Sequence, residues 1–292
     1  MGAAMIKVAP RVSALRDGAD ERIAAPKLRL EGVGKRFDVS GAQATIAVAD
    51  FTLDIARGEF LVIVGPSGCG KTTVLNVLAG LEAPTSGAVT IDGRAIRGPG
   101  PDRGVMFQDY ALFPWHTVWG NVEFGLRHGP AGAGLDVDAR RKRVASYVDL
   151  VGLSGSEAKY PHQLSGGMRQ RVALARLMAN EPDVLLMDEP LAALDAQTRI
   201  ILQDELLRIW GQDRPAAGRR TVVFITHAID EAVFLADRVA VMTSHPGRIK
   251  AVIDVDLPRP RNDATRALPQ FQALTQHIWS LIRDEAYRAT VT

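Results

Sequence analysis

The sequence contains a single cysteine, Cys69, so no disulfide can form within the chain. This cysteine usage fits a reducing compartment. The formal net charge is only +2, so the charge balance does not require a nucleic acid as partner. No stretch of the chain approaches the roughly 20 consecutive apolar residues that a membrane-spanning helix needs. We therefore expect a soluble chain.

The first residues of the chain carry no continuous apolar segment. Charges such as those of Lys7, Arg11 and Arg16 interrupt each short apolar run, so a secretory signal is not expected. The chain begins with Met-Gly, but Ile6 stands where a myristoylation signal has Ser or Thr. We interpret residues 1–27 as a flexible N-terminal tail.

Short apolar runs without polar alternation recur along the chain. This pattern is typical of strands that are buried on both faces of a parallel sheet covered by helices, and it predicts an α/β fold. Hydrophobic residues make up 47% of the chain and charged residues 23%, as in an ordinary globular protein. Turn residues near Gly87 indicate that the neighbouring strand is antiparallel. The predicted buried strands are 60–64, 184–187, 222–225 and 239–242, and the predicted antiparallel strand is 88–91.

Two further regions are predicted to be helical. Residues 109–180 form a mostly helical subdomain, in which Val144, Tyr147 and Val148 follow helical spacing. An amphipathic helix follows Pro269, and its apolar stripe is best interpreted as packing against the rest of the chain. We therefore expect three regions: a tail at 1–27, a main domain at 28–261 and a C-terminal helical extension at 262–292.

A glycine-rich loop follows the predicted strand 60–64 and leads directly into a helical pattern. In this context its sequence is that of a P-loop, and a plain glycine turn between strand and helix is the minor alternative. The glycines let backbone N–H groups approach phosphates, and the helix N-terminus adds partial positive charge. We expect Lys71 to reach the β- and γ-phosphates and Thr72 to ligate Mg²⁺. The candidate nucleotide-binding residues are Gly65, Pro66, Ser67, Gly68, Cys69, Gly70, Lys71, Thr72 and Thr73.

The predicted strand 184–187 runs directly into two carboxylates, Asp188 and Glu189. They would lie at the carboxyl edge of the sheet, where α/β proteins bind ligands. We expect Asp188 to hold Mg²⁺ through water and Glu189 to orient and deprotonate the attacking water. An acidic pair by itself often only caps a helix, but a P-loop in the same chain favours the catalytic interpretation.

The sequence Leu-Ser-Gly-Gly-Met at 164–168 opens another helical pattern. The hydroxyl of Ser165, the free N–H groups of Gly166 and Gly167 and the helix dipole would all attract an anion. Taken alone, this segment favours a simple helix cap by Ser165. Together with the P-loop, however, it gives one chain two phosphate-binding helix ends, with the helical subdomain between them.

From about residue 28 to about residue 261, the motifs occur in the order of the ABC-transporter nucleotide-binding domains, which the sequence closely resembles. The family signature reads Leu-Ser-Gly-Gly-Gln, and Met168 replaces its last residue. The resemblance implies a P-loop NTPase cassette with a RecA-like parallel-sheet core, an antiparallel β subdomain and a helical subdomain. It also implies that two cassettes pack head to tail, with each ATP held between the P-loop of one chain and Ser165, Gly166 and Gly167 of the other.

The resemblance adds four residues to the candidate site. Gln108 matches the Q-loop glutamine, which touches Mg²⁺ and the attacking water, and His227 matches the switch histidine that contacts the γ-phosphate. Asp195 matches the D-loop, although Ala192 stands where serine is common. Phe37 matches the aromatic residue that stacks on adenine, where tyrosine is more usual. Without the resemblance, Phe37 would be assigned to the core and His227 would stay unassigned.

The resemblance also implies membrane partners. It places the surface that receives a permease's coupling helix directly after Gln108, where an aromatic, proline-containing patch suits a groove for an apolar helix face. The alternative, that Phe113, Trp115 and Trp119 build the subdomain's own core, is equally supported. The implied assembly holds two cassettes, favoured as a homodimer because both half-sites are intact, and two transmembrane permease subunits. A periplasmic solute-binding protein would act through the permease, and the cassettes would lie on the cytoplasmic face of a bacterial inner membrane.

The amino-acid sequence of the aromatic patch indicates a subfamily. Phe-Pro-Trp at 113–115 resembles the nitrate, sulfonate and taurine import ATPases, and residues 98–100 and 269–288 resemble most the taurine branch. None of these residues would touch the cargo, which the binding protein and the pore select. Taurine, other sulfonates and nitrate therefore stay open as cargo.

Other P-loop proteins fit the sequence less well. DNA-repair ATPases of this superfamily carry a long coiled coil between P-loop and signature, but no sustained heptads occur here. Ribosome-acting members carry two cassettes, whereas this chain has one P-loop and one signature. A small-molecule kinase would not account for Ser165, Asp195 and His227. A soluble ABC ATPase that acts on nucleic acid or ribosomes is thus the alternative to a transporter subunit.

Overall fold

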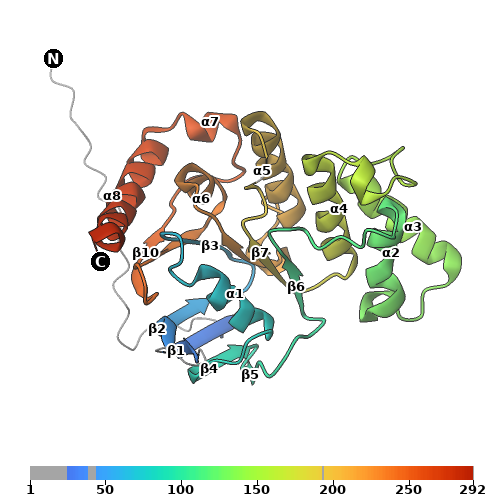
Figure 1. The fold of residues 1–292 in the computed structure, drawn as a ribbon. Helices are drawn as coiled ribbons and strands as arrows, with labels where there is room; N and C mark the ends of the chain where they lie inside the picture. Colours follow the sequence, from blue (N-terminus) through green and yellow to red (C-terminus); the bar gives the residue numbers. More distant parts are fainter. Residues whose placement is uncertain (1–24, 39–43, 193, 292) are drawn as a thin grey trace, which may run out of the picture.

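The computed structural model describes residues 25–38, 44–192 and 194–291. Its centre is a six-stranded sheet in the order β10-β9-β3-β8-β7-β6 (Figure 1). All of these strands are parallel except β10, which pairs antiparallel with β9. The predicted buried strands are confirmed. The strands are β3 (Phe60–Val64), β6 (Arg103–Met106), β7 (Val184–Asp188), β8 (Thr221–Ile225), β9 (Arg238–Met242) and β10 (Ile249–Asp254).

Alternate residues of the central strands face two different hydrophobic clusters. Leu61 and Ile63 of β3 join a cluster with helix α1 (Lys71–Ala79) and a second, antiparallel sheet. Phe60 and Val62 join a cluster on the opposite face. Because both faces are covered, the strands show no polar alternation. The second sheet has the order β2-β1-β4-β5, with β1 (Leu28–Phe37), β2 (Thr45–Ile55), β4 (Ser86–Ile91) and β5 (Arg94–Ala95).

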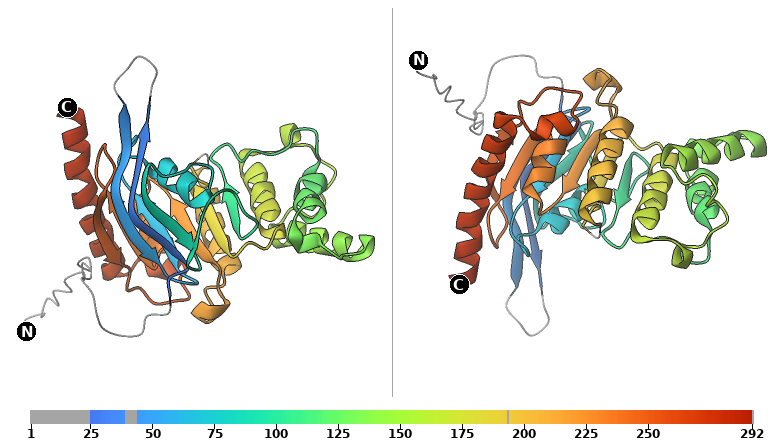
Figure 2. Two further views of the ribbon diagram at one scale, coloured as in Figure 1. Left: turned by 90° about the horizontal axis from the view of Figure 1, so that it is seen from below. Right: turned by 90° about the horizontal axis from the view of Figure 1, so that it is seen from above.

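Helices cover the opposite face of the central sheet (Figure 2). The predicted C-terminal amphipathic helix is confirmed, since Phe271, Leu274 and Ile278 are buried and the next apolar residues of the stripe are partly buried. None of the helices in the described part of the chain is both long and apolar enough to cross a membrane. The covering helices are α5 (Ala196–Trp210), α6 (Ile229–Leu235), α7 (Asp263–Arg266) and α8 (Pro269–Val291).

A helical subdomain projects beyond the β6 edge of the sheet, on the side of the molecule away from α8 (Figures 1 and 2). The predicted helical character of residues 109–180 is confirmed, and Val144 and Val148 are buried in it. The helices are α2 (Val118–His128), α3 (Val137–Leu150) and α4 (Gly166–Ala179), with short 3-10 turns at Pro130–Gly132 and Pro161–Gln163; a third 3-10 turn, Ala216–Gly218, lies outside the subdomain, between α5 and β8.

The last residue of the predicted N-terminal tail belongs to the fold. Lys27 is fully buried, and its ammonium donates hydrogen bonds of 2.8 Å to Asp92 and to Asp183. A buried ammonium is stable only with such partners, so the predicted boundary after residue 27 lies too late in the chain. Residues 1–24 of the predicted tail lie outside the described residues.

Candidate nucleotide-binding site

The sheet brings most of the predicted site residues to one edge. Strands β3, β6, β7 and β8 are parallel, so their carboxyl ends meet at the edge where α/β proteins bind ligands. β3 leads into the P-loop, β7 ends at Asp188 followed by Glu189, and β8 leads to His227. β6 ends two residues before Gln108, which is exposed.

The P-loop backbone depends on its glycines. Gly70 has a φ of +93°, and a Cβ atom there would lie 2.7 Å from the carbonyl oxygen of Ala47. Gly65 lies so close to Cys69 that a Cβ atom would be 2.9 Å from its Sγ. Gly70 is also the N-cap of α1 and has no side chain to cap the helix, so N–H groups of the first turn are left for an anion.

The side chains of Lys71 and Cys69 pack against the P-loop itself. The Nζ of Lys71 donates hydrogen bonds of 2.9 Å to the carbonyl oxygens of Gly65 and Pro66, which keeps the ammonium at the loop. Burial raises the pKa of the Cys69 thiol, although Lys71 Nζ lies 3.8 Å from its Sγ. Cys69 therefore stays a neutral packing residue, and no redox role follows from its position.

The side-chain oxygens of Thr72 and Asp188 are paired beside the P-loop. The Thr72 hydroxyl donates a hydrogen bond of 2.8 Å to Asp188 Oδ2. Burial raises the pKa of Asp188, and the hydrogen bond from Thr72 opposes this effect. A hydroxyl and a carboxylate are ligands that Mg²⁺ accepts, with substrate phosphates and water completing its shell. Thr72 and Asp188 therefore fit a Mg²⁺ ion that arrives with a nucleotide. A metal site built from three or more His, Cys, Asp or Glu side chains does not occur among the described residues.

Glu189 and His227 contact each other across two strand ends. Nδ1 of His227 lies 3.2 Å from Oε2 of Glu189. Glu189 has a φ of +45°, and its N–H donates to the Ile225 carbonyl at 3.0 Å, so the turn after β7 is tied to β8. A non-glycine residue in this conformation costs about 1 kcal/mol or more and is found most often at functional sites.

A buried carboxylate that we did not predict fixes the turn around His227. Glu231 accepts hydrogen bonds from the hydroxyl of Thr226 and, at 3.1 Å, from the amide of Gln203. Burial raises the pKa of Glu231, against the effect of the hydrogen bond from Thr226. The Thr226 hydroxyl in turn accepts from the N–H of Ala228 at 3.1 Å, so both neighbours of His227 are held. An acid in the first turn of a helix was the only signal for Glu231 in the sequence.

The segment after Gln108 is hydrogen-bonded to α4, the helix whose N-cap is Ser165. Tyr110 and Ala111 have φ values of +62° and +42°, and their carbonyl oxygens accept hydrogen bonds of 2.7 and 2.6 Å from Arg176 of α4. The same guanidinium lies 5.3 Å from the ring centroid of Phe113. We did not predict this role, because a basic residue on a helix is ordinarily a solvated one.

Ser165 and Asp195 lie at helix N-termini elsewhere on the chain. Ser165 is exposed, and its Oγ accepts a hydrogen bond of 3.3 Å from the N–H of Met168. Asp195 caps α5 by accepting from the N–H and the hydroxyl of Thr198 at 3.0 and 2.7 Å. Among the described residues, no hydrogen bond joins either residue to the P-loop. The helix N-terminus predicted at Ser165 is therefore observed, but it is not part of the site at the sheet edge, and its binding of phosphate stays a prediction. Ala193, inside the predicted D-loop, lies outside the described residues.

Phe37 lies at the end of β1, opposite Thr45 of β2. Its side chain is 37% exposed, and Nζ of Lys35 lies 5.0 Å from the ring centroid. An exposed ring at a strand end is available for stacking, whereas a core phenylalanine would be covered.

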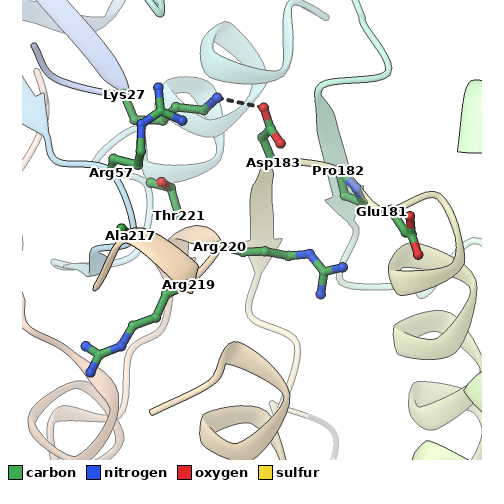
Figure 3. A pocket seen from close by; sticks show the side chains of 9 residues that line it. All are labelled: Lys27, Arg57, Glu181, Pro182, Asp183, Ala217, Arg219, Arg220 and Thr221. Atoms are coloured by element: carbon green, nitrogen blue, oxygen red, sulfur yellow. Dashed lines mark hydrogen bonds and ion pairs between the residues drawn. The ribbon is translucent and has the colours of Figure 1, made fainter. Parts of the chain in front are cut away.

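The hollow in Figure 3 lies at the other edge of the central sheet, by the amino ends of β7 and β8, and does not coincide with the predicted site. It has a volume of about 310 Å³ and is lined in part by Lys27, Arg57, Asp183 and Arg219. These charges are largely paired within the fold: Lys27 with Asp92 and Asp183, and Arg57 with Asp92. None of the predicted site residues lines it.

Comparison with known proteins places the chain in a family. A model described as ABC transporter matches residues 48–192, which include the P-loop, the signature and the Asp188–Glu189 pair. An uncharacterized ABC transporter ATP-binding protein of Methanocaldococcus jannaschii is 48% identical over 90% of this chain and 94% of its own length. The chain belongs to the ATP-binding subunits of ABC transporters. This cassette is an ATPase, and the predicted cassette fold is confirmed.

Two further relatives of the cassette have names that state a cargo. The aliphatic sulfonates import ATP-binding protein SsuB of Bacillus licheniformis is 45% identical over 82% of this chain and 88% of its own length. The bicarbonate transport ATP-binding protein CmpC of Synechococcus elongatus is 46% identical over 80% of this chain, which corresponds to 34% of that protein. A solved dimeric ATP-binding cassette, in a post-hydrolysis state with ADP and phosphate, superposes with a TM-score of 0.68 at 32% identity. The superposition covers 78% of this chain and 98% of that one.

Proposed function

We propose that this cassette is the ATP-hydrolysing subunit of an ABC importer for a small anion. The observation that carries the proposal is the gathering of Thr72, Asp188, Glu189 and His227 beside the P-loop at one sheet edge. This arrangement provides phosphate-binding backbone, oxygen ligands for a divalent cation and a carboxylate base within one site. Phosphoryl transfer to water needs little more than this positioning and charge.

Within this proposal, the P-loop and the Thr72–Asp188 pair bind MgATP. The N–H groups of the first turn of α1 receive the phosphates, and the Lys71 ammonium turns from the Gly65 and Pro66 carbonyls to the β- and γ-phosphates. Thr72 and, through water, Asp188 would hold Mg²⁺, with Gln108 as a further ligand. When bound, the ion neutralises charge on the phosphate oxygens. Phe37 offers its exposed ring to the adenine.

Glu189 is the proposed base. Its carboxylate accepts the proton of the attacking water, which Gln108 helps to orient. His227 contacts Glu189 through Nδ1 and is itself largely exposed, so it is free to turn toward a γ-phosphate. That movement would release the Glu189 carboxylate for the water. The buried Glu231 holds the turn on which His227 moves.

The site is proposed to be completed by a second copy of the chain. Ser165 is exposed at the N-terminus of α4, with Gly166 and Gly167 half-buried beside it, and Asp195 is exposed at the N-terminus of α5. The dimeric state of the superposed cassette supports a pair of chains, which the family resemblance implies to be head to tail. ATP would then lie between two chains, and its hydrolysis would release them.

The aromatic patch after Gln108 is the proposed docking surface for a permease on the cytoplasmic face of the membrane. Trp115 is 69% exposed, while Phe113 packs on Phe124 with ring centroids 4.5 Å apart. Trp119 packs against the core, so the two alternatives for the patch apply to different residues. Trp115 is available to a coupling helix, and Trp119 supports the subdomain. Arg176 joins this patch to the helix of the signature.

We propose a sulfonate such as taurine as cargo, with nitrate as the next candidate. The sulfonate and bicarbonate relatives match this chain at nearly equal identity, so they support a small anion rather than one compound. Membership in the transporter family favours this role over the nucleic-acid alternative. The test is reconstitution in proteoliposomes with each candidate permease and solute-binding protein. ATP hydrolysis stimulated by one of taurine, other sulfonates, nitrate or bicarbonate, with uptake of that anion, is expected. Equal hydrolysis with and without every candidate permease would contradict a transport role.

A further inference from the structure

Helix α8 holds both ends of the turn between β9 and β10, residues 243–248. Glu285 of α8 is only 2% exposed, and its carboxylate accepts hydrogen bonds from the N–H and the hydroxyl of Ser244 at 3.0 and 3.2 Å. At the other end of the turn, the Lys250 ammonium donates to Glu285 at 2.7 Å and to the Leu281 carbonyl at 2.9 Å. Ser244 in the turn and Lys250 of β10, just after it, are therefore fastened to the same part of α8.

The turn is braced internally. The N–H of Thr243 donates to the carbonyl of Arg248 at 3.0 Å, and the N–H of Arg248 donates to the Thr243 hydroxyl at 3.0 Å. The same hydroxyl donates to the Pro246 carbonyl at 3.1 Å. Because these bonds close the turn on itself, a shift at its ends also moves its tip.

The tip of the turn, Gly247, lies against the P-loop. Its N–H donates to the Ala47 carbonyl at 3.0 Å, and its carbonyl accepts from Ala49 at 2.9 Å. A Cβ atom on Gly247 would lie 2.0 Å from the carbonyl oxygen of Cys69, so only glycine allows this approach. Ala47 also limits the space around Gly70, as described above. The turn, β2 and the P-loop thus meet backbone to backbone.

The carboxylate of Glu285 forms directional hydrogen bonds, which apolar packing would not provide. Burying it is costly unless its oxygens are hydrogen-bonded, and here Ser244 and Lys250 provide the bonds. These bonds fix where the turn lies relative to α8, whereas the apolar stripe of α8 allows sliding. The catalytic residues proposed above make no use of Glu285.

We propose that Glu285 is a positioning residue for the nucleotide site: through the turn 243–248 it keeps the P-loop in the shape that receives phosphate, so docking of α8 sets the affinity for ATP. This inference rests on the proposed binding of ATP at the P-loop. Glu285 does not touch the nucleotide. Release of α8 would weaken ATP binding and leave proton transfer at Glu189 unchanged.

The test compares full-length Glu285→Gln with Asp284→Asn, a matched change at the exposed neighbour on the same helix. Equilibrium titration with a fluorescent ATP analogue should show Kd raised about tenfold in Glu285→Gln, as expected for loss of a charged hydrogen bond. The KM for ATP should rise by a similar factor while kcat stays within about twofold of the parent, the pattern of lost binding rather than lost chemistry. Asp284→Asn should match the parent.

A second variant tests the contact between the turn 243–248 and the P-loop. Gly247→Ala changes neither Glu285 nor its bonding partners but forces residue 247 away from Cys69, and it should raise the Kd as well. If Glu285→Gln does not fold, Gly247→Ala still tests whether the turn 243–248 sets the shape of the P-loop. A Glu285→Gln protein with a lower Tm and the parent's Kd would show a purely structural role and overturn the inference, as would a Gly247→Ala protein with the parent's Kd. Failure of the parent itself to bind ATP would instead overturn the proposed function.

Discussion

His227 Nδ1 lies 3.2 Å from Oε2 of Glu189, and this contact joins the turns that follow two neighbouring parallel strands. The turn at Glu189 has a strained backbone, and the buried Glu231 fixes the backbone on either side of His227 through Thr226. The proposed base and the group proposed to meet the γ-phosphate are therefore in direct contact.

Lys71→Ala should abolish tight ATP binding. The substitution removes the cation that the Gly65 and Pro66 carbonyls hold at the P-loop, and a charged hydrogen bond to phosphate is worth about 1.5–3 kcal/mol. We expect the Kd to rise by about tenfold to a hundredfold. Equilibrium binding of a fluorescent ATP analogue with Mg²⁺ measures this, and undiminished affinity would contradict the P-loop assignment.

Ser165→Arg should leave ATP binding to each monomer intact and abolish hydrolysis. Ser165 is exposed on its own chain and is proposed to meet the γ-phosphate on the other chain, where an arginine would clash. Mixing Ser165→Arg with Lys71→Ala should restore part of the activity, because one of the two shared sites in the heterodimer carries neither change. No recovery in mixtures in which heterodimers demonstrably form would count against the shared site.

The parts of this structure that could be predicted are those that depend on local sequence. The buried strands follow from continuous apolar runs, and the P-loop follows from a fixed local pattern of glycines. Lys27 was misplaced because its partners Asp92 and Asp183 lie 65 and 156 residues away. Arg176 and Glu285 were missed for the same reason, since a charged residue on a helix looks solvated until the distant backbone that it binds is known.

His227 and Phe37 became candidates only through resemblance to a family. Neither a lone histidine after a strand nor a single aromatic residue carries enough local signal to be distinguished from packing. In the structure, Phe37 is exposed and His227 contacts Glu189, and these two observations support the roles proposed for them.

Trp115→Ala should leave hydrolysis by the isolated cassette unchanged and reduce its stimulation by the permease. Trp115 is the most exposed of the large hydrophobic side chains in the described chain, and central aromatic residues of interfaces often contribute about 2 kcal/mol or more. Trp279→Ala, at an exposed tryptophan on α8, is the matched control and should keep full stimulation. If the permease stimulated Trp115→Ala as strongly as Trp279→Ala, the docking surface would have to lie elsewhere on the cassette.

Glu285→Gln should lower stability in a pH-dependent way. Burial raises the pKa of Glu285, but the hydrogen bonds from Lys250 and Ser244 outweigh this and hold it below the ordinary value of 4.5. A carboxyl whose pKa falls on folding stabilises the folded state above its unfolded value, and this stabilisation is lost as pH falls through the folded value. Urea unfolding at about pH 7 should show a deficit of about 1–3 kcal/mol in the variant.

The same deficit should shrink as the pH is lowered below 4.5, because the parent then loses the charge that the variant lacks. Asp284→Asn serves again as the control. A deficit that stays constant with pH would show that the Glu285 charge does not contribute to stability.

Glu189→Gln tests the central claim, that ATP joins two chains and that Glu189 ends the association by activating water. The amide keeps the size of the side chain but removes the base, and proton removal by a positioned base is typically worth about 10²–10⁴ in rate. Lys71, Thr72 and Asp188 are unchanged, so MgATP should still bind.

Size-exclusion chromatography with and without MgATP is the most direct measurement. We predict that Glu189→Gln elutes as an ATP-bound dimer with MgATP and as a monomer without it, while the parent returns to monomer as it consumes ATP. A Glu189→Gln protein that binds ATP yet remains monomeric at every accessible concentration, or one that hydrolyses ATP at the parent's rate, would contradict the account.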